Sequence, residues 1–117
     1  MTDSQKSELM ELTNCIVSTV PALKVYLFGS FAYGHPDEES DFDLYVIIPD
    51  GQMRSIEAMH QIRRALSGLQ KRPVDLLVGT RKKFDKMKNL PAIEKEVAER
   101  GVVLYERGMS GSGSEVA

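Results

Sequence analysis

The chain has 117 residues, 42% of them hydrophobic and 27% charged, and its formal net charge is −2, as expected of one soluble globular domain. A weakly acidic chain is not expected to bind nucleic acid over its whole surface, and no apolar run approaches the roughly 18 residues that cross a membrane. The single cysteine, Cys15, cannot form an intramolecular disulfide, which suits a reducing compartment. Together with the lack of a long apolar run, this leads us to expect a cytoplasmic protein with no membrane partner.

Residues 2–20 predict an amphipathic helix. Thr2 and Gln5 have the spacing of a capping box, and Pro21 ends the helical pattern. One face of this helix is apolar. The residues of that face are Leu9, Leu12, Ile16 and Val20.

Residues 24–28 predict a strand that runs into Gly29 and Ser30, followed by a short helix over residues 30–33. A helix N-terminus presents backbone N–H groups to an anion, and glycine lets the backbone approach a phosphate closely. The Ser30 hydroxyl would be a further donor. Gly29 and Ser30 are therefore candidate nucleotide-binding residues.

Residues 41–48, which follow a polar loop at 35–39, predict the central strand. Successive side chains of a strand point to opposite faces, so Asp41 and Asp43 share one face. The apolar residues of the other face are Phe42, Leu44, Val46 and Ile48. Adjacent carboxylates repel each other, and burying them without a cation is costly. Because carboxylate oxygens and substrate phosphates suit Mg²⁺, this pair is a candidate site for a magnesium-bound nucleoside triphosphate.

Residues 52–69 predict a second long helix with one apolar stripe. The residues of this stripe are Ile56, Met59, Ile62, Leu66 and Leu69. The opposite side of the helix is polar, so we expect the stripe to face the core.

Asp75 is an acidic residue inside the apolar run at 74–78, which predicts another strand. A charge in such a run needs a partner. If this strand neighbours residues 41–48, Asp75 completes a carboxylate triad with the two earlier aspartates. An ordinary salt bridge to Lys71 or Arg72 is the alternative.

The last third of the chain predicts two helices and a strand. Thr80 could cap a basic helix over residues 81–88, which could meet phosphate or an acidic partner or remain a solvated face. A helix over 92–100 and a strand over 102–106 follow. The residues that this last helix is expected to pack inward are Ile93 and Val97. Residues 109–117 are rich in glycine and serine and predict a flexible tail.

The spacing Gly29-Ser30-x10-Asp41-x-Asp43 resembles the signature of the DNA polymerase β-like nucleotidyltransferase superfamily. More narrowly, the chain is similar to the minimal nucleotidyltransferases encoded beside HEPN-domain toxins. The resemblance covers about residues 24–106 and includes the segments 28–34, 40–44, 74–78 and 100–106. It implies an α/β (α+β) fold in which a small mixed sheet has helices mainly on one face. One nucleotidyltransferase domain would then occupy residues 1–108.

The resemblance also implies an activity. The enzyme would be a magnesium-dependent adenylyltransferase that moves AMP from ATP to a hydroxyl, expected to be a tyrosine, of a HEPN-type toxin. This AMPylation would neutralise the toxin and make the chain an antitoxin. Asp41, Asp43 and Asp75 would be catalytic and would hold two Mg²⁺ ions, while Gly29 and Ser30 would bind the β- and γ-phosphates.

Two other functions stay open at the level of sequence. The nucleotidyltransferase core takes up nearly the whole chain, so we expect either a macromolecular acceptor that brings its own surface or an acceptor site that another subunit completes, in a homo- or hetero-oligomer. In one alternative the chain only masks its partner and the nucleotide site is vestigial; the three clustered acids argue against that. In the other, the acceptor is a small molecule such as an aminoglycoside.

Overall fold

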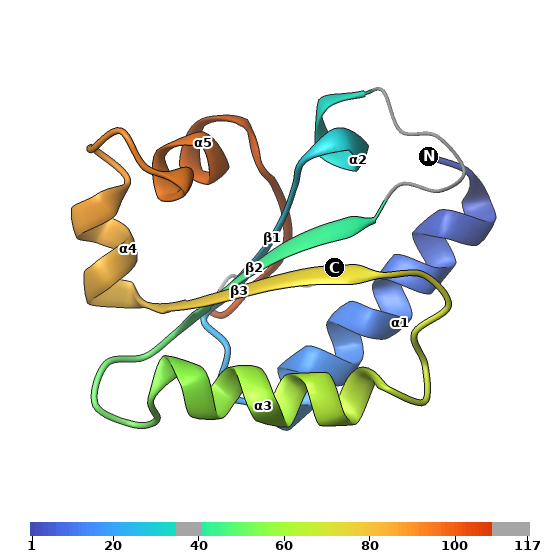
Figure 1. The fold of residues 1–117 in the computed structure, drawn as a ribbon, viewed down its shortest axis with the longest axis horizontal. Coiled ribbons are helices and arrows are strands. Elements are labelled where there is room, and N and C mark those ends of the chain that lie inside the picture. Colours follow the sequence, from blue (N-terminus) through green and yellow to red (C-terminus); the bar gives the residue numbers. More distant parts are fainter. Residues whose placement is uncertain (35–40, 109–117) are drawn as a thin grey trace.

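The computed structural model describes residues 1–34 and 41–108, which form a four-stranded mixed sheet and five helices (Figure 1). The elements are α1 (Asp3–Thr19), β1 (Lys24–Phe28), α2 (Ser30–Tyr33), β2 (Phe42–Ile48), α3 (Ser55–Leu66), β3 (Val74–Thr80), α4 (Arg81–Met87), α5 (Ile93–Arg100) and β4 (Val102–Glu106). The strand order is β3-β2-β1-β4; β1 runs antiparallel to both neighbours, and β2 and β3 are parallel. The expected polar loop at 35–39 and the expected tail at 109–117 lie outside the described residues.

The two longest helices lie together on one face of the sheet. Figure 1 shows α1 and α3 below the sheet and the shorter α2, α4 and α5 above it. The mixed α/β fold implied by the resemblance is thus confirmed, and α4 and α5 add a smaller layer on the second face. None of the helices formed by the described residues combines the length and the apolar character that a bilayer crossing requires.

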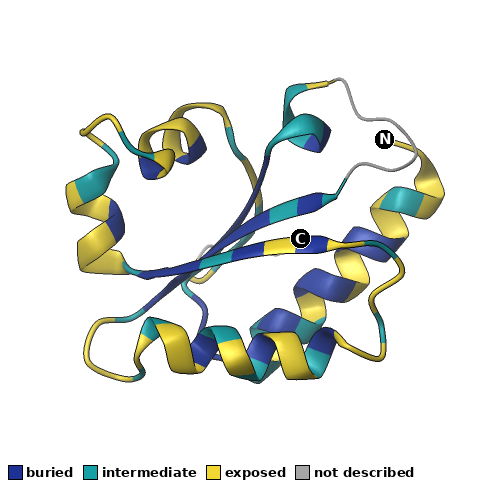
Figure 2. Cartoon of the chain, viewed as in Figure 1, coloured by how far each residue is buried: buried dark blue, intermediate teal, exposed yellow. Residues whose placement is uncertain are grey.

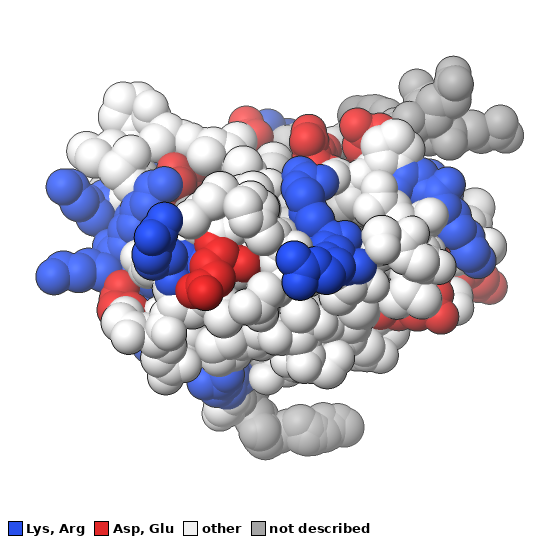
Figure 3. Space-filling view, turned by 60° about the horizontal axis from the view of Figure 1, so that its bottom comes forward, with Lys and Arg blue, Asp and Glu red and all other residues white. Residues whose placement is uncertain are grey.

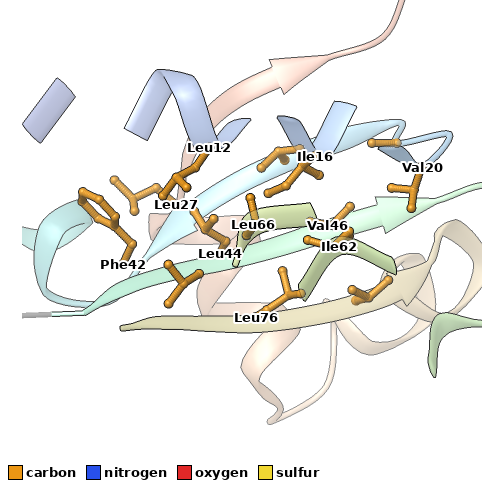
Figure 4. Packing of buried hydrophobic residues seen from close by; sticks show 14 of the residues in the cluster. Leu12, Ile16, Val20, Leu27, Phe42, Leu44, Val46, Ile62, Leu66 and Leu76 are labelled. Carbon is orange, nitrogen blue, oxygen red and sulfur yellow. The ribbon is translucent and has the colours of Figure 1, made fainter. Parts of the chain in front are cut away.

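The main core lies between the sheet and the pair α1 and α3. Alternate residues of β2 point into it, as predicted, and meet apolar side chains of both helices (Figure 4). The fully buried residues labelled there include Leu12, Ile16, Leu44, Val46 and Ile62. Burying one such side chain stabilises the fold by about 1.5–3 kcal/mol. Because β2 commits these residues to the helix side, its odd-numbered residues must face the other way.

The start of α1 has the predicted capping box. Thr2 Oγ1 accepts a hydrogen bond from the Gln5 backbone N–H at 3.1 Å, and Gln5 Oε1 accepts one from the Thr2 N–H at 2.8 Å. Two of the four N-terminal N–H groups that a helix leaves unpaired are thereby satisfied. The apolar face predicted for this helix is buried (Figure 2).

The helix α3 is shorter than predicted, and its stripe is rotated. It spans Ser55–Leu66 rather than 52–69, since turns occupy both flanks. Its buried residues are Ala58, Ile62 and Leu66, which repeat every four positions. Ile56 lies off this stripe and is 45% exposed, so its assignment to the core was wrong. Ile93 is likewise 40% exposed, because α5 turns Glu94 and Val97 inward instead.

Candidate active site

Asp43 and Asp75 are register partners on the parallel strands β2 and β3. The strand that carries Asp75 does neighbour the central strand, which was the condition for a carboxylate cluster. Asp43 is half-buried, whereas Asp75 lies exposed on the edge strand. The two carboxylates therefore share one face of the sheet, the face opposite the main core.

The electrostatics of this pair favour a bound proton or cation. Burial, followed by the negative charges of Asp75 and Asp41, raises the pKa of Asp43 to about 6. Asp41 directly precedes β2 and is also half-buried. Crowded carboxylates of this kind lower their free energy when a cation lies between them.

A preassembled metal cage is not part of this arrangement. Among residues 1–34 and 41–108, no group of three or more His, Cys, Asp or Glu side chains is placed to hold a metal ion by itself. The donors present are carboxylate oxygens, which suit a hard divalent ion that completes its coordination with substrate phosphates and water. The residues therefore fit a magnesium ion that arrives with a triphosphate.

Gly29 lies directly against the carboxylate of Asp43. Its φ of 75° is in the region that favours glycine, and a Cβ built there would overlap the Asp43 side chain. The neighbouring residue Phe28 is the register partner of Asp43 across β1 and β2. Ser30 then begins α2, as predicted. The glycine, the serine and the aspartate pair thus meet at one end of the sheet.

Arg72 does not pair with Asp75, which removes that alternative. Its Nε and Nη2 donate to Glu8 Oε2 and Oε1 at 2.9 and 3.1 Å, and the guanidinium lies 4.8 Å from the centre of the Phe42 ring. In the part of the chain that the structure describes, Asp75 takes part in no ion pair. Its carboxylate is therefore available on the surface of the site.

A buried hydrogen bond beside Asp43, on the same face of β2, was not anticipated. The Tyr45 hydroxyl donates to Glu94 Oε2 at 2.8 Å, and both side chains are almost fully buried. Burial and this bond raise the pKa of Tyr45. Tyr45 follows Asp43 by two positions on the same face of β2, and its ring passes over Gly79 of β3. Strand alternation could have placed Tyr45 on this face, but no local signal points to a partner 49 positions away.

A second unanticipated contact brings a cation beside α2. The guanidinium carbon of Arg100 lies 3.9 Å from the centre of the Tyr33 ring. Tyr33 follows Ser30 by three positions, so both residues belong to the same short helix. The pattern of the sequence identified Arg100 only as the end of a helix. The contact holds the C-terminus of α5 close to the element that begins with Ser30.

A mixed sheet that gathers a Gly-Ser pair and facing aspartates at one end is the architecture of a nucleotidyltransferase. The chain belongs to the nucleotidyltransferase domain family, whose model matches residues 9–104. No curated protein matches the chain.

Solved structures of similar fold agree with this assignment. A putative nucleotidyltransferase from Sulfolobus solfataricus is 22% identical, with a TM-score of 0.60 over 86% of this chain and 79% of that one. A mutant of the toxin–antitoxin complex MntA–HpeT is 17% identical, with a TM-score of 0.59 over 87% and 76%. A toxin–antitoxin structure with AMP-PNP is 19% identical, with a TM-score of 0.56 over 91% and 77%. At these identities the likeness establishes the fold.

Proposed function

We propose that the protein is a magnesium-dependent adenylyltransferase that transfers AMP from ATP to a hydroxyl group of a partner protein. The observation that carries this proposal is the pairing of Asp43 with Asp75 beside Gly29. Facing carboxylates next to a backbone that can approach phosphate are what a metal–triphosphate substrate requires.

The residues of the chain have distinct roles in this reaction. Gly29 and Ser30 bind the β- and γ-phosphates, and Asp41 and Asp43 hold the metal-bound triphosphate in line with the acceptor. The acceptor oxygen attacks the α-phosphorus, and the bond from that phosphorus to the bridging oxygen of the β-phosphate breaks, which releases pyrophosphate. Asp75, exposed and without an ion-pair partner among the described residues, takes up the proton of the acceptor hydroxyl.

The metal contributes charge neutralisation to this scheme. Two magnesium ions, when held by Asp41, Asp43, Asp75 and the triphosphate, would stabilise the attacking and leaving oxygens. Without them, the negative charges of the substrate and the aspartates would repel each other. This is why we expect ATP binding to depend on a divalent ion.

We further propose that the acceptor is a HEPN-type toxin, that the modified residue is a tyrosine, and that the modification neutralises the toxin. Support comes from the toxin–antitoxin structures that share the fold, one of which contains AMP-PNP. The reaction would take place in the cytoplasm, and an oligomer with the partner or with further copies of the chain is part of this proposal. Cys15, the one cysteine of the sequence, is compatible with a reducing compartment.

Intact-mass spectrometry tests this function. The protein is incubated with ATP, magnesium and the partner that co-purifies with it from its native host. We expect the partner to gain AMP moieties, and the Asp75→Asn variant to bind the partner without modifying it. A bound partner that gains no mass would favour a masking module, and AMP on an aminoglycoside instead would favour a small-molecule transferase.

A further inference from the structure

A second cavity lies on the same side of the sheet as the aspartates but at its other end. It has a volume of about 400 Å³, which is within the range of ligand-binding sites. Lys24 and Ile47, which are register partners, both line it. Ile47 follows Asp43 by four positions in β2, so the backbones of these two residues are about 13 Å apart along the strand, and none of the candidate active-site aspartates, Gly29 or Ser30 lines the cavity. It is therefore separate from the candidate active site.

The lining of this cavity carries excess positive charge. The cations are Lys24, Arg81, Lys88 and Arg107, and the acids are Asp85 and Glu106. Both acids are already engaged: Glu106 Oε2 lies 3.4 Å from Lys24 Nζ, and Asp85 lies 3.4 Å from Lys88 Nζ and 3.8 Å from Arg81 Nε. Arg107 has no ion-pair partner among the described residues. Two positive charges thus remain uncompensated, although the whole chain has a net charge of −2.

The inner wall of the cavity is aromatic and firmly packed. The rings of Tyr26 and Phe84 are stacked with their centres 5.7 Å apart, and both residues are buried. Lys24 Nζ lies 5.0 Å from the centre of the Tyr26 ring, which fixes one cation at the edge of this wall. The cavity is therefore a shaped site rather than a loose group of surface charges.

Positive charge continues beyond the cavity along α4. One face of this helix lines the cavity with Arg81 and Phe84, and the residue that caps its C-terminus, Lys88, lines it too. The other cations of the helix, Lys82, Lys83 and Lys86, line no part of it. Figure 3 shows Lys and Arg side chains in several groups, one of which lies at the left, the side on which α4 lies in Figure 1. An occupant that uses both the cavity and its cationic surroundings must be larger than the cavity itself.

We infer that this cavity is a docking site for acidic side chains of the polypeptide that receives the nucleotide. The inference rests on the proposed transfer to a protein. A recessed site with excess positive charge accepts one or two carboxylates, and Leu23 and Ala98, the more exposed apolar residues of its lining, can contact the apolar part of the same segment. A nucleic acid fits less well, because a net excess of two positive charges matches one or two carboxylates rather than a long row of phosphates. Recognition of the acceptor and chemistry would then occur at opposite ends of one sheet.

The test measures binding of a fluorescein-labelled peptide of glutamates with one phenylalanine, by fluorescence polarisation, to the full chain. Lys88→Gln with Arg107→Gln neutralises two cations of the cavity; Lys82→Gln with Lys86→Gln is the matched control, with the same loss of charge outside it. We expect the cavity variant to weaken binding about tenfold or more and the control less than about twofold. Arg107→Gln alone should also weaken binding. Because this residue is exposed and follows β4, the single variant should fold normally, so it shows whether misfolding explains the loss in the double variant.

Three outcomes of the binding assay would overturn the docking site. The first is that the wild type does not bind the peptide. The second is that both double variants lose the same fraction of peptide affinity. The third is that a single-stranded RNA of equal charge binds more tightly than the peptide and is weakened by the same cavity substitutions. Failure of the proposed function looks different. In that case the peptide would bind in the cavity but no protein would gain AMP. If instead the cavity variants transferred AMP to the partner as fast as the wild type, only the docking site would be contradicted.

Discussion

Asp43 and Asp75 lie side by side on one face of the sheet, as register partners on two adjacent parallel strands, with Asp43 half-buried and Asp75 exposed. This relationship makes the metal-free site electrostatically unfavourable at neutral pH, because the two carboxylates and Asp41 share a small volume. The repulsion mainly disfavours the ionised form of Asp43, the more buried of the two residues, whose pKa is raised to about 6.

Replacement of Asp43 by asparagine should stabilise the metal-free protein in a pH-dependent way. The folded chain binds the Asp43 proton more tightly than the unfolded chain does, so this contribution to stability is present below about pH 4 and is lost as the pH rises through about 6. Asp43→Asn should therefore melt higher than the wild type near pH 7.5, and the difference should vanish towards pH 4. Thermal unfolding in a chelator measures this. Glu99→Gln, an exposed change on α5, is the control; a gain for Asp43→Asn that does not vary with pH would contradict the assignment.

Gly29→Ala should abolish nucleotidyl transfer. A Cβ at this position would displace the Asp43 carboxylate, in addition to straining a backbone with φ of 75°. Gly51 has nearly the same φ, 78°, and open space around it, so Gly51→Ala separates the two effects. We expect Gly51→Ala to lose only about 1 kcal/mol of unfolding free energy and to keep full activity. Equal activities of the two variants would show that the contact with Asp43 has no part in the reaction.

Tyr45 and Gly79 should be energetically coupled. A Cβ at Gly79 would overlap the Tyr45 hydroxyl and come within 3.2 Å of Tyr45 Cζ. Gly79→Ala should cost about 1–3 kcal/mol, and Tyr45→Phe a similar amount because it leaves Glu94 without its donor. The double variant should lose about 1 kcal/mol less than the sum. Urea unfolding measures the cycle; Gly68→Ala, with nothing near its added Cβ, should be additive with Tyr45→Phe.

The ion pair between Glu8 and Arg72 should be a strong structural link. It is bidentate, the side chains are 7% and 18% exposed, and the guanidinium also stacks on Phe42. Removal of either partner leaves a nearly buried charge and should cost about 3 kcal/mol. Glu8→Leu combined with Arg72→Met should cost clearly less than the two single changes together, as measured by urea unfolding. Strict additivity would mean that the two charges do not depend on each other.

Much of the site could be predicted from the sequence because it depends on local rules. Strand alternation was enough to predict that Asp41 and Asp43 share one face. The approach of Gly29 to a phosphate stays a prediction, and its contact with the Asp43 side chain was not anticipated. The pairing of Asp75 could be stated only as a condition, since strand order depends on the whole sheet.

The remaining features depend on contacts between distant parts of the chain. The partners Tyr45 and Glu94 are 49 positions apart, and Arg72 and Glu8 are 64 apart, so neither pair leaves a local pattern. Ile56 was misassigned for a related reason. Its spacing suits an apolar stripe, but the face of α3 that packs on the sheet and α1 is the one that carries Ala58, Ile62 and Leu66.

Calorimetry of magnesium-ATP binding tests the central claim, that the clustered aspartates beside Gly29 form the nucleotide site. The wild type should bind ATP only when a divalent ion is present. Asp41→Asn with Asp43→Asn should abolish this binding in a protein that remains folded, because the metal ligands are lost while the core is unchanged. Asp75→Asn should still bind ATP, since Asp41 and Asp43 remain to hold the metal-bound triphosphate and Asp75 is proposed to act mainly on the proton of the acceptor hydroxyl. Unchanged magnesium-ATP affinity in the folded double variant would contradict the account.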